Sequence, residues 1–140
     1  MGSKTKITVE CTIKSSLDKV WKYWTTPEQI MLWNHASDDW HCPKATNNLK
    51  IGERFNYTMA AKDGSFSFDF EGTYTEVIEN KSIKYVLDDE REVSVDFIAI
   101  GDLVEIVETF EAETQNPIDL QQFGWQAILT NFKKLVEENN

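Results

Sequence analysis

Regular alternation of apolar and polar residues is the feature of this sequence that most restricts its fold. In residues 6–14 every second side chain from Ile7 to Ile13 is apolar, and those between are polar or charged. The same period of two returns through residues 53–111. This period is typical of β-strands that turn one face toward a core and the other toward water. The sequence therefore predicts an antiparallel sheet with one apolar face.

Turn-forming residues divide residues 53–111 into five predicted strands. The pair Asp63-Gly64 is a strong signal for a hairpin turn between two alternating segments. The other turns are expected at residues 80–81, 88–90 and 101–102.

The last predicted strand contains the sharpest candidate for a functional group. Glu108 shares the strand face of Ile106 and Phe110, which predicts that its carboxylate points toward the core. Burying an isolated charge is costly, so an inward carboxylate must be hydrogen-bonded, solvated in a cavity or protonated. A β-bulge or an edge position that turns Glu108 to water stays open as the alternative.

Two short helices are predicted directly after the first strand. Ser15 or Ser16 can cap the first, in which apolar residues recur at helical spacing. The second begins with Thr26 as N-cap and Pro27 in the first turn, and it ends near Trp33. Residues 34–52, which follow, show no periodicity and are predicted to form a long loop.

A long amphipathic helix is predicted at the C-terminal end. It begins with Asn116 as N-cap and Pro117 at the first helical position, and it runs to about Glu138. This helix is the only element large enough to cover the apolar face of a six-stranded sheet. Its apolar stripe consists of Ile118, Trp125, Ile128, Leu129, Phe132, Leu135 and Val136.

These elements predict an α+β fold with one domain over residues 1–140, a curved antiparallel sheet of six strands around the C-terminal helix. A cavity is expected between sheet and helix, because Gly72 and Gly124 leave gaps in the middle of a strand and of the helix.

Charge and hydropathy exclude several classes of protein. The formal net charge of −10 argues against binding to nucleic acid or docking on anionic lipid. No apolar run approaches the ~20 residues of a membrane span, and residues 1–7 contain no signal peptide. We therefore expect a cytoplasmic protein in which Cys11 and Cys42 are free thiols. The oligomeric state stays open, a homodimer included.

The order of elements resembles the START-like (SRPBCC, Bet v-type) superfamily with its helix-grip fold. Within it the chain is similar to the domain related to the activator of the heat-shock protein 90 ATPase, and residues 33–43 resemble a bacterial subgroup of that branch. The resemblance spans residues 6–138. The motifs that carry it are SLDKVW at 16–21, WTTPE at 24–28, Trp33, GERF at 52–55, FEGTYTEV at 70–77 and Gly124-Trp125.

The resemblance implies a cavity for an apolar or amphipathic small molecule, such as a lipid or an aromatic metabolite, and no cofactor. Some members of the superfamily are cyclases. The co-chaperone role belongs to eukaryotic members with a separate N-terminal domain, and 140 residues leave no room for one, so we do not expect that activity here.

The candidate ligand-binding residues combine aromatic side chains on the predicted inward faces with a few polar groups. Plain core packing is the alternative for each aromatic residue. Gln121 or Gln122 is expected to face the sheet and to offer its amide. The full set is Trp33, Trp40, Phe55, Tyr57, Phe68, Phe70, Tyr85, Glu108, Gln121, Trp125 and Phe132.

Histidines in the predicted loop supply a second, weaker candidate. His35 and His41 lie close in sequence to Asp38, Asp39 and Cys42. This spacing matches no standard zinc arrangement, so no metal site is predicted. Either histidine could instead act as a base beside Glu108.

Three functions remain open at this point. The favoured one is a small-molecule binding domain without chemistry of its own. The second is an enzyme like a polyketide cyclase or a hydrolase, in which Glu108 works with His35 or His41. The third is a protein-interaction module that uses the outer sheet face, for which the polar side chains of that face are unfavourable.

Overall fold

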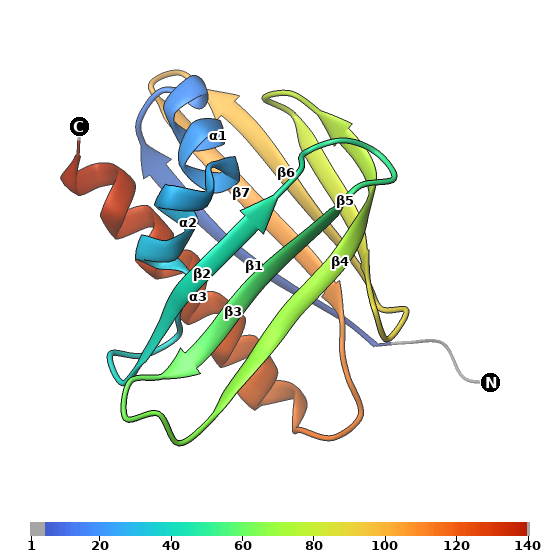
Figure 1. Ribbon diagram of the computed structural model, residues 1–140. Helices are drawn as coiled ribbons and strands as arrows, with labels where there is room; N and C mark the ends of the chain where they lie inside the picture. The colour runs from blue at the N-terminus through green and yellow to red at the C-terminus, as the bar shows by residue number, and fades with distance from the viewer. Residues whose placement is uncertain (1–4, 140) are drawn as a thin grey trace.

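The computed structural model describes residues 5–139 as one antiparallel sheet that curls around a long helix (Figure 1). The strand order across the sheet is β1-β7-β6-β5-β4-β3-β2. The strands are β1 (Lys6–Lys14), β2 (Trp40–Asn47), β3 (Arg54–Ala61), β4 (Ser67–Ile78), β5 (Ser82–Leu87), β6 (Glu92–Ile100) and β7 (Leu103–Glu111). This is the α+β helix-grip architecture that the sequence predicts.

The sheet contains seven strands rather than the predicted six. The additional strand, β2, lies inside residues 34–52, the segment predicted as a loop. Its register with β3 shifts between His41 and Lys44. Such an irregularity breaks the alternation of side chains, and Pro43 within it cannot donate to the ladder. The strand therefore gives no period of two in the sequence.

Three helices complete the fold: α1 (Leu17–Thr25), α2 (Pro27–Trp33) and α3 (Ile118–Glu138). Ser16 caps α1 by accepting a hydrogen bond from the Lys19 N–H at 3.3 Å. Thr26 stands at the N-cap of α2, but its side chain makes no capping bond. In α3 the N-cap is Pro117, one residue later than predicted. The Asn116 side chain donates instead to Glu113.

The helices close the open side of the curled sheet. α3 crosses the concave face and packs against β1, while α2 packs against β2 and α1 against β6 and β7 (Figure 1). The core between them is formed by the inward residues of the strands together with Leu129, Phe132 and Val136 of α3. Among residues 5–139, no helix is both long and apolar enough to cross a membrane.

The hairpin turn and the free thiols predicted from the sequence are both present. The Asp63-Gly64 turn is confirmed, because Gly64 adopts a positive φ of 78° and Asp63 accepts a hydrogen bond from the Ser65 N–H. Cys11 and Cys42 are both free, although Cys42 lies in strand β2 and not in a loop. Residues 1–4, on which the expectation about a signal peptide partly rests, lie outside the described residues.

Gly72 is a point of close approach and not a gap. A Cβ at this position would lie 2.8 Å from the carbonyl oxygen of Val86 and 2.9 Å from a ring carbon of Phe55. The Phe55 ring therefore occupies the space that a side chain at position 72 would need. At Gly124, by contrast, a Cβ would meet nothing within 4 Å.

Gly72→Ala is accordingly expected to lower the free energy of unfolding by about 1–3 kcal/mol, because the backbone oxygen of Val86 cannot move cheaply. Urea denaturation measures the change. Gly124→Ala is the matched control and should be neutral or stabilising, since alanine favours the helix. An equal loss in both variants would contradict the steric explanation.

Candidate ligand-binding site

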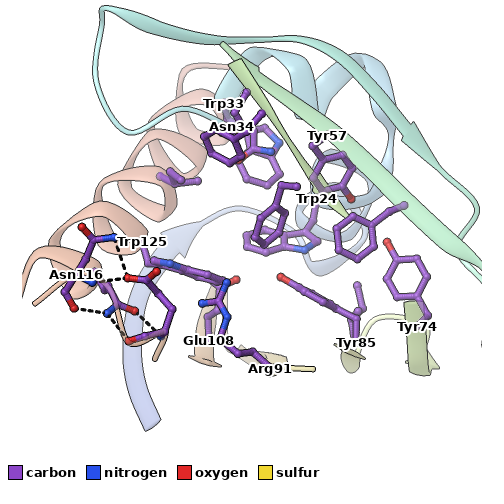
Figure 2. A pocket seen from close by; sticks show the side chains of 18 residues that line it. Trp24, Trp33, Asn34, Tyr57, Tyr74, Tyr85, Arg91, Glu108, Asn116 and Trp125 are labelled. Atoms are coloured by element: carbon purple, nitrogen blue, oxygen red, sulfur yellow. Dashed lines mark hydrogen bonds between the residues drawn. The ribbon is translucent and has the colours of Figure 1, made fainter. Parts of the chain in front are cut away.

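A cavity of about 300 Å³ lies between the concave face of the sheet and α3 (Figure 2). Nine of the predicted residues line it. Those from the strands are Phe55, Tyr57, Phe68, Phe70, Tyr85 and Glu108, and those from the helices are Trp33, Gln121 and Trp125. The alternation of the strands brings the first group to one face, and the helical spacing of Gln121 and Trp125 brings these two side chains over it.

Aromatic rings form most of the cavity wall. Phe55 is central among them, with its ring centroid 4.8 Å from that of Tyr85 and 4.9 Å from that of Tyr57. On the helix side, Trp125 stacks on Phe110 at 3.8 Å and meets the edge of Phe70 at 5.9 Å. These contacts hold the rings in place around the hollow.

The hydroxyl groups of Tyr57 and Tyr74 are used within the protein. The Tyr57 hydroxyl interacts with that of Tyr74, which donates to Asn47 Oδ1 at 2.6 Å. The Asn47 amide then donates to the carbonyl oxygen of Thr25 at 2.7 Å. Burial raises the pKa of Tyr74 to about 12. This chain ties the end of α1 to the sheet and leaves the two rings as apolar wall.

Glu108 points into the cavity, as the period of β7 predicts. The residue is 6% exposed, and its carboxyl makes no hydrogen bond to any residue in the described part of the chain. Burial raises the pKa of this carboxyl from its ordinary 4.5 to about 8. Figure 2 shows the Tyr85 hydroxyl pointing toward Glu108 from the neighbouring part of the sheet. At neutral pH Glu108 is therefore mostly a neutral carboxylic acid.

The amide of Gln121 is occupied by the protein itself. Its Oε1 accepts from the Glu113 N–H at 3.0 Å, and its Nε2 donates to the carbonyl oxygens of Glu113 and Asn116 at 3.1 and 2.8 Å. Gln121 thus holds the segment between β7 and α3 against the helix, and Gln122 is exposed. Gln121 is thus the buried one of the two glutamines, and its amide is engaged by the loop and not free to bind a ligand.

Two predicted residues lie outside the cavity. Trp40 packs against Phe66 and Phe68 near the outer end of β4, with ring centroids 6.0 and 6.1 Å away. Phe132 is fully buried behind the cavity wall, 4.9 Å from Trp24 and 5.0 Å from Trp33. The alternative of core packing holds for Phe132.

Nine lining residues were not predicted from the sequence. Trp24 lies on the predicted helical stripe of α1, so a signal for it was present, and Met59, Tyr74 and Ile83 share the inward strand faces. Arg91, Glu113 and Asn116 come from turns and loops, where no periodicity marks them. The remaining two are Asn34 and Ile128.

Neither histidine of the predicted loop lines the cavity. His35 is partly buried, which lowers the pKa of its imidazole, and its carbonyl oxygen accepts from Asn131 Nδ2 at 2.6 Å. His41 is exposed on β2. Over residues 5–139, no group of three or more His, Cys, Asp or Glu side chains is arranged to hold a metal ion.

Residues 14–137 match the protein family described as "Activator of Hsp90 ATPase homolog 1-like protein". The chain belongs to this family. The match covers most of the chain and agrees with the START-like superfamily that the sequence motifs resemble. Among proteins with curated descriptions, none matches the chain.

Solved structures support the assignment to this AHSA1-like family. An AHSA1-like protein from Aeromonas hydrophila is 44% identical with a TM-score of 0.91, over 96% of this chain and 94% of that one. Chr148 from Cytophaga hutchinsonii is 53% identical with a TM-score of 0.83, over 96% and 93%. CV1439 from Chromobacterium violaceum, at 18% identity and a TM-score of 0.85 over 95% and 98%, shares the fold.

Proposed function

We propose that this AHSA1-like domain binds an apolar or amphipathic small molecule in the cavity between the sheet and α3. The observation that carries the proposal is the cavity of about 300 Å³ itself, with its wall of aromatic rings and a buried, unpaired carboxyl group among residues 5–139. Sites for small molecules are typically concave and apolar, with few polar groups that orient the ligand.

The size of the cavity limits the ligand. A cavity of about 150 Å³ lined by aliphatic and aromatic side chains can hold benzene, so about 300 Å³ admits a molecule of two fused rings or a short acyl chain. Phe68 lines the cavity and is 46% exposed, which supports entry of a ligand beside this side chain.

The enzyme alternative lacks the histidine that it needs beside Glu108. It requires a base beside Glu108, and both His35 and His41 lie outside the cavity lining. The interaction alternative requires a largely apolar outer sheet face. Polar pairs such as Thr58 with Asp69 at 2.9 Å lie on that face beside the exposed Ile98. We therefore keep ligand binding as the single proposal.

Native mass spectrometry of the purified protein, followed by thermal unfolding with two-ring aromatic compounds, tests the proposal. We expect a bound small molecule or a rise in Tm with such compounds. Trp125→Ala should weaken binding by about tenfold or more, because a large ring of the cavity wall is lost. Phe123→Ala is the matched control, since Phe123 lies on the same helix with 73% of its surface exposed.

The control variant should bind as the parent protein does. Equal weakening in Trp125→Ala and Phe123→Ala would place the binding site elsewhere. If no compound raises the Tm and no molecule co-purifies, the proposal is wrong.

A further inference from the structure

Several polar groups of the cavity wall make no hydrogen bond within residues 5–139, and most of these groups can donate one. Within residues 5–139 no hydrogen bond engages the indole N–H of Trp24 or Trp125, or the Tyr85 hydroxyl. An indole nitrogen can only donate, and a tyrosine hydroxyl can donate or accept. The Asn34 amide is also unpaired, and Figure 2 places it beside Trp33, away from Glu108.

Glu108 adds a further donor in its neutral form. The groups that can titrate around it are Tyr85 from β5, Arg91 from the turn before β6 and Cys11 from β1, while α3 presents the apolar side chains of Trp125 and Ile128. Burial raises the pKa of the Glu108 carboxyl to about 8. A carboxylic acid kept neutral by apolar surroundings donates a hydrogen bond through its O–H.

Arg91 makes this part of the cavity unfavourable for a cation. Its Nε donates to Asp89 at 2.7 Å and its Nη1 to the Glu111 carbonyl oxygen at 3.4 Å, so the guanidinium is held at the cavity wall. Its Nη2 makes no hydrogen bond to any side chain or backbone group of residues 5–139. A guanidinium can only donate. Glu113, the other charged lining residue, accepts two hydrogen bonds from Asn116.

Resting on the proposed function, we infer that the ligand carries an acceptor oxygen, a carbonyl or a carboxylate, that receives hydrogen bonds from Glu108 and Tyr85. Figure 2 shows the two side chains directed toward a common part of the open space, with Arg91 beside them. Two donors aimed at one point orient an oxygen atom, and the aromatic wall takes the apolar remainder of the molecule.

Three probes with the same two rings and different substituents test the inference. They are 2-acetylnaphthalene, 2-ethylnaphthalene and 2-naphthylmethylammonium, titrated by calorimetry at pH 6.5. The acetyl compound should bind about tenfold more tightly than the ethyl compound, as expected for hydrogen bonds formed in an apolar site. The ammonium compound should bind most weakly.

Variants assign that preference to the two side chains. Glu108→Leu should abolish most of the preference for the acetyl over the ethyl compound, and Tyr85→Phe should reduce that preference several-fold. Glu108→Gln keeps an N–H donor and should keep the preference. Glu105→Gln is the matched control, because Glu105 points to the other face of β7 and the change should leave all three affinities as they are.

The pH dependence separates a donated from an accepted hydrogen bond. Between pH 6.5 and 9.5 Glu108 ionises, so the parent protein should lose at least about tenfold in affinity for the acetyl compound, whereas Glu108→Gln should change less than about twofold. Circular dichroism at both pH values checks that each variant is folded.

The outcomes distinguish the inference from the proposed function. Tightest binding of the ammonium compound, or a preference for the acetyl compound that survives in Glu108→Leu, contradicts the inference and leaves ligand binding standing. If none of the three compounds binds, the inference is wrong, and the proposed function is decided separately by the co-purified molecule and the Tm measurements.

Discussion

Glu108→Gln is expected to be more stable than the parent protein at pH 8.5 and within about 1 kcal/mol of it at pH 5. The cause is the carboxyl group in the cavity wall, which must lose its proton within an apolar environment as the pH rises. Each unit of pKa shift corresponds to about 1.4 kcal/mol. The rise from 4.5 to about 8 therefore corresponds to at most about 5 kcal/mol of stability.

The direction follows from the proton count. Between pH 4.5 and about 8 the folded protein holds a proton on Glu108 that the unfolded chain has released. Stability falls with pH wherever the native state binds more protons than the unfolded state. The stabilisation by the neutral acid is thus complete below pH 4.5 and is lost by about pH 8. Glutamine carries no such proton, so its variant lacks this slope.

Urea denaturation of both proteins from pH 5 to 8.5 measures the difference. Comparing the two cancels the contributions of groups that they share, such as His35, whose partial burial lowers the pKa of its imidazole. Glu105→Gln again serves as the control, and its stability should follow that of the parent. Parallel curves for parent and Glu108→Gln would show that Glu108 is ionised and solvated in the folded protein.

The inward position of Glu108 could be predicted because β7 pairs without a register shift on either side. Its pairing is continuous with β1 from Leu103 to Glu111 and with β6 from Leu103 to Phe110, so the period of two holds along the strand. The irregularity that stayed open as an alternative does not occur there. In β2 the register does shift, so apolar and polar residues do not alternate and the strand could not be predicted. Periodicity is informative only for strands without irregularities.

The face of a helix could be predicted, but not the depth of its residues in the structure. Trp125 and Phe132 occupy the same apolar stripe of α3, yet one lines the cavity and the other is fully buried. The difference depends on Trp24 and Trp33, which reach the helix from α1 and α2 and surround Phe132. These contacts join residues about a hundred positions apart, and no local pattern records them.

The charged groups at the cavity were the part most difficult to predict. Arg91 lies at the junction between a turn and β6, and Glu113 and Asn116 lie between β7 and α3. Loop residues follow no period, so their direction depends on tertiary contacts, here the hydrogen bonds from Gln121 to the loop backbone.

Phe132→Ala is expected to lower the free energy of unfolding by about 3–5 kcal/mol, the usual cost of removing a fully buried aromatic ring. Phe132 has no exposed surface, and its ring meets the edges of Trp24 and Trp33 at 4.9 and 5.0 Å. These contacts join all three helices of the fold. Urea denaturation at pH 7 measures the loss.

The same variant separates structural packing from ligand contact. Phe132 lies behind the cavity wall, so Phe132→Ala should reduce stability while its affinity for a two-ring aromatic compound stays within about threefold of the parent, as expected for a residue without direct contact. Trp125→Ala should lower the ligand affinity more strongly than it lowers the stability, because part of that ring borders the cavity. If Phe132→Ala is unfolded at 25 °C, Phe132→Leu, which leaves a smaller void, allows the same comparison. A loss of affinity in the Phe132 variants as large as that in Trp125→Ala would show that the ligand reaches the cluster of Trp24, Trp33 and Phe132.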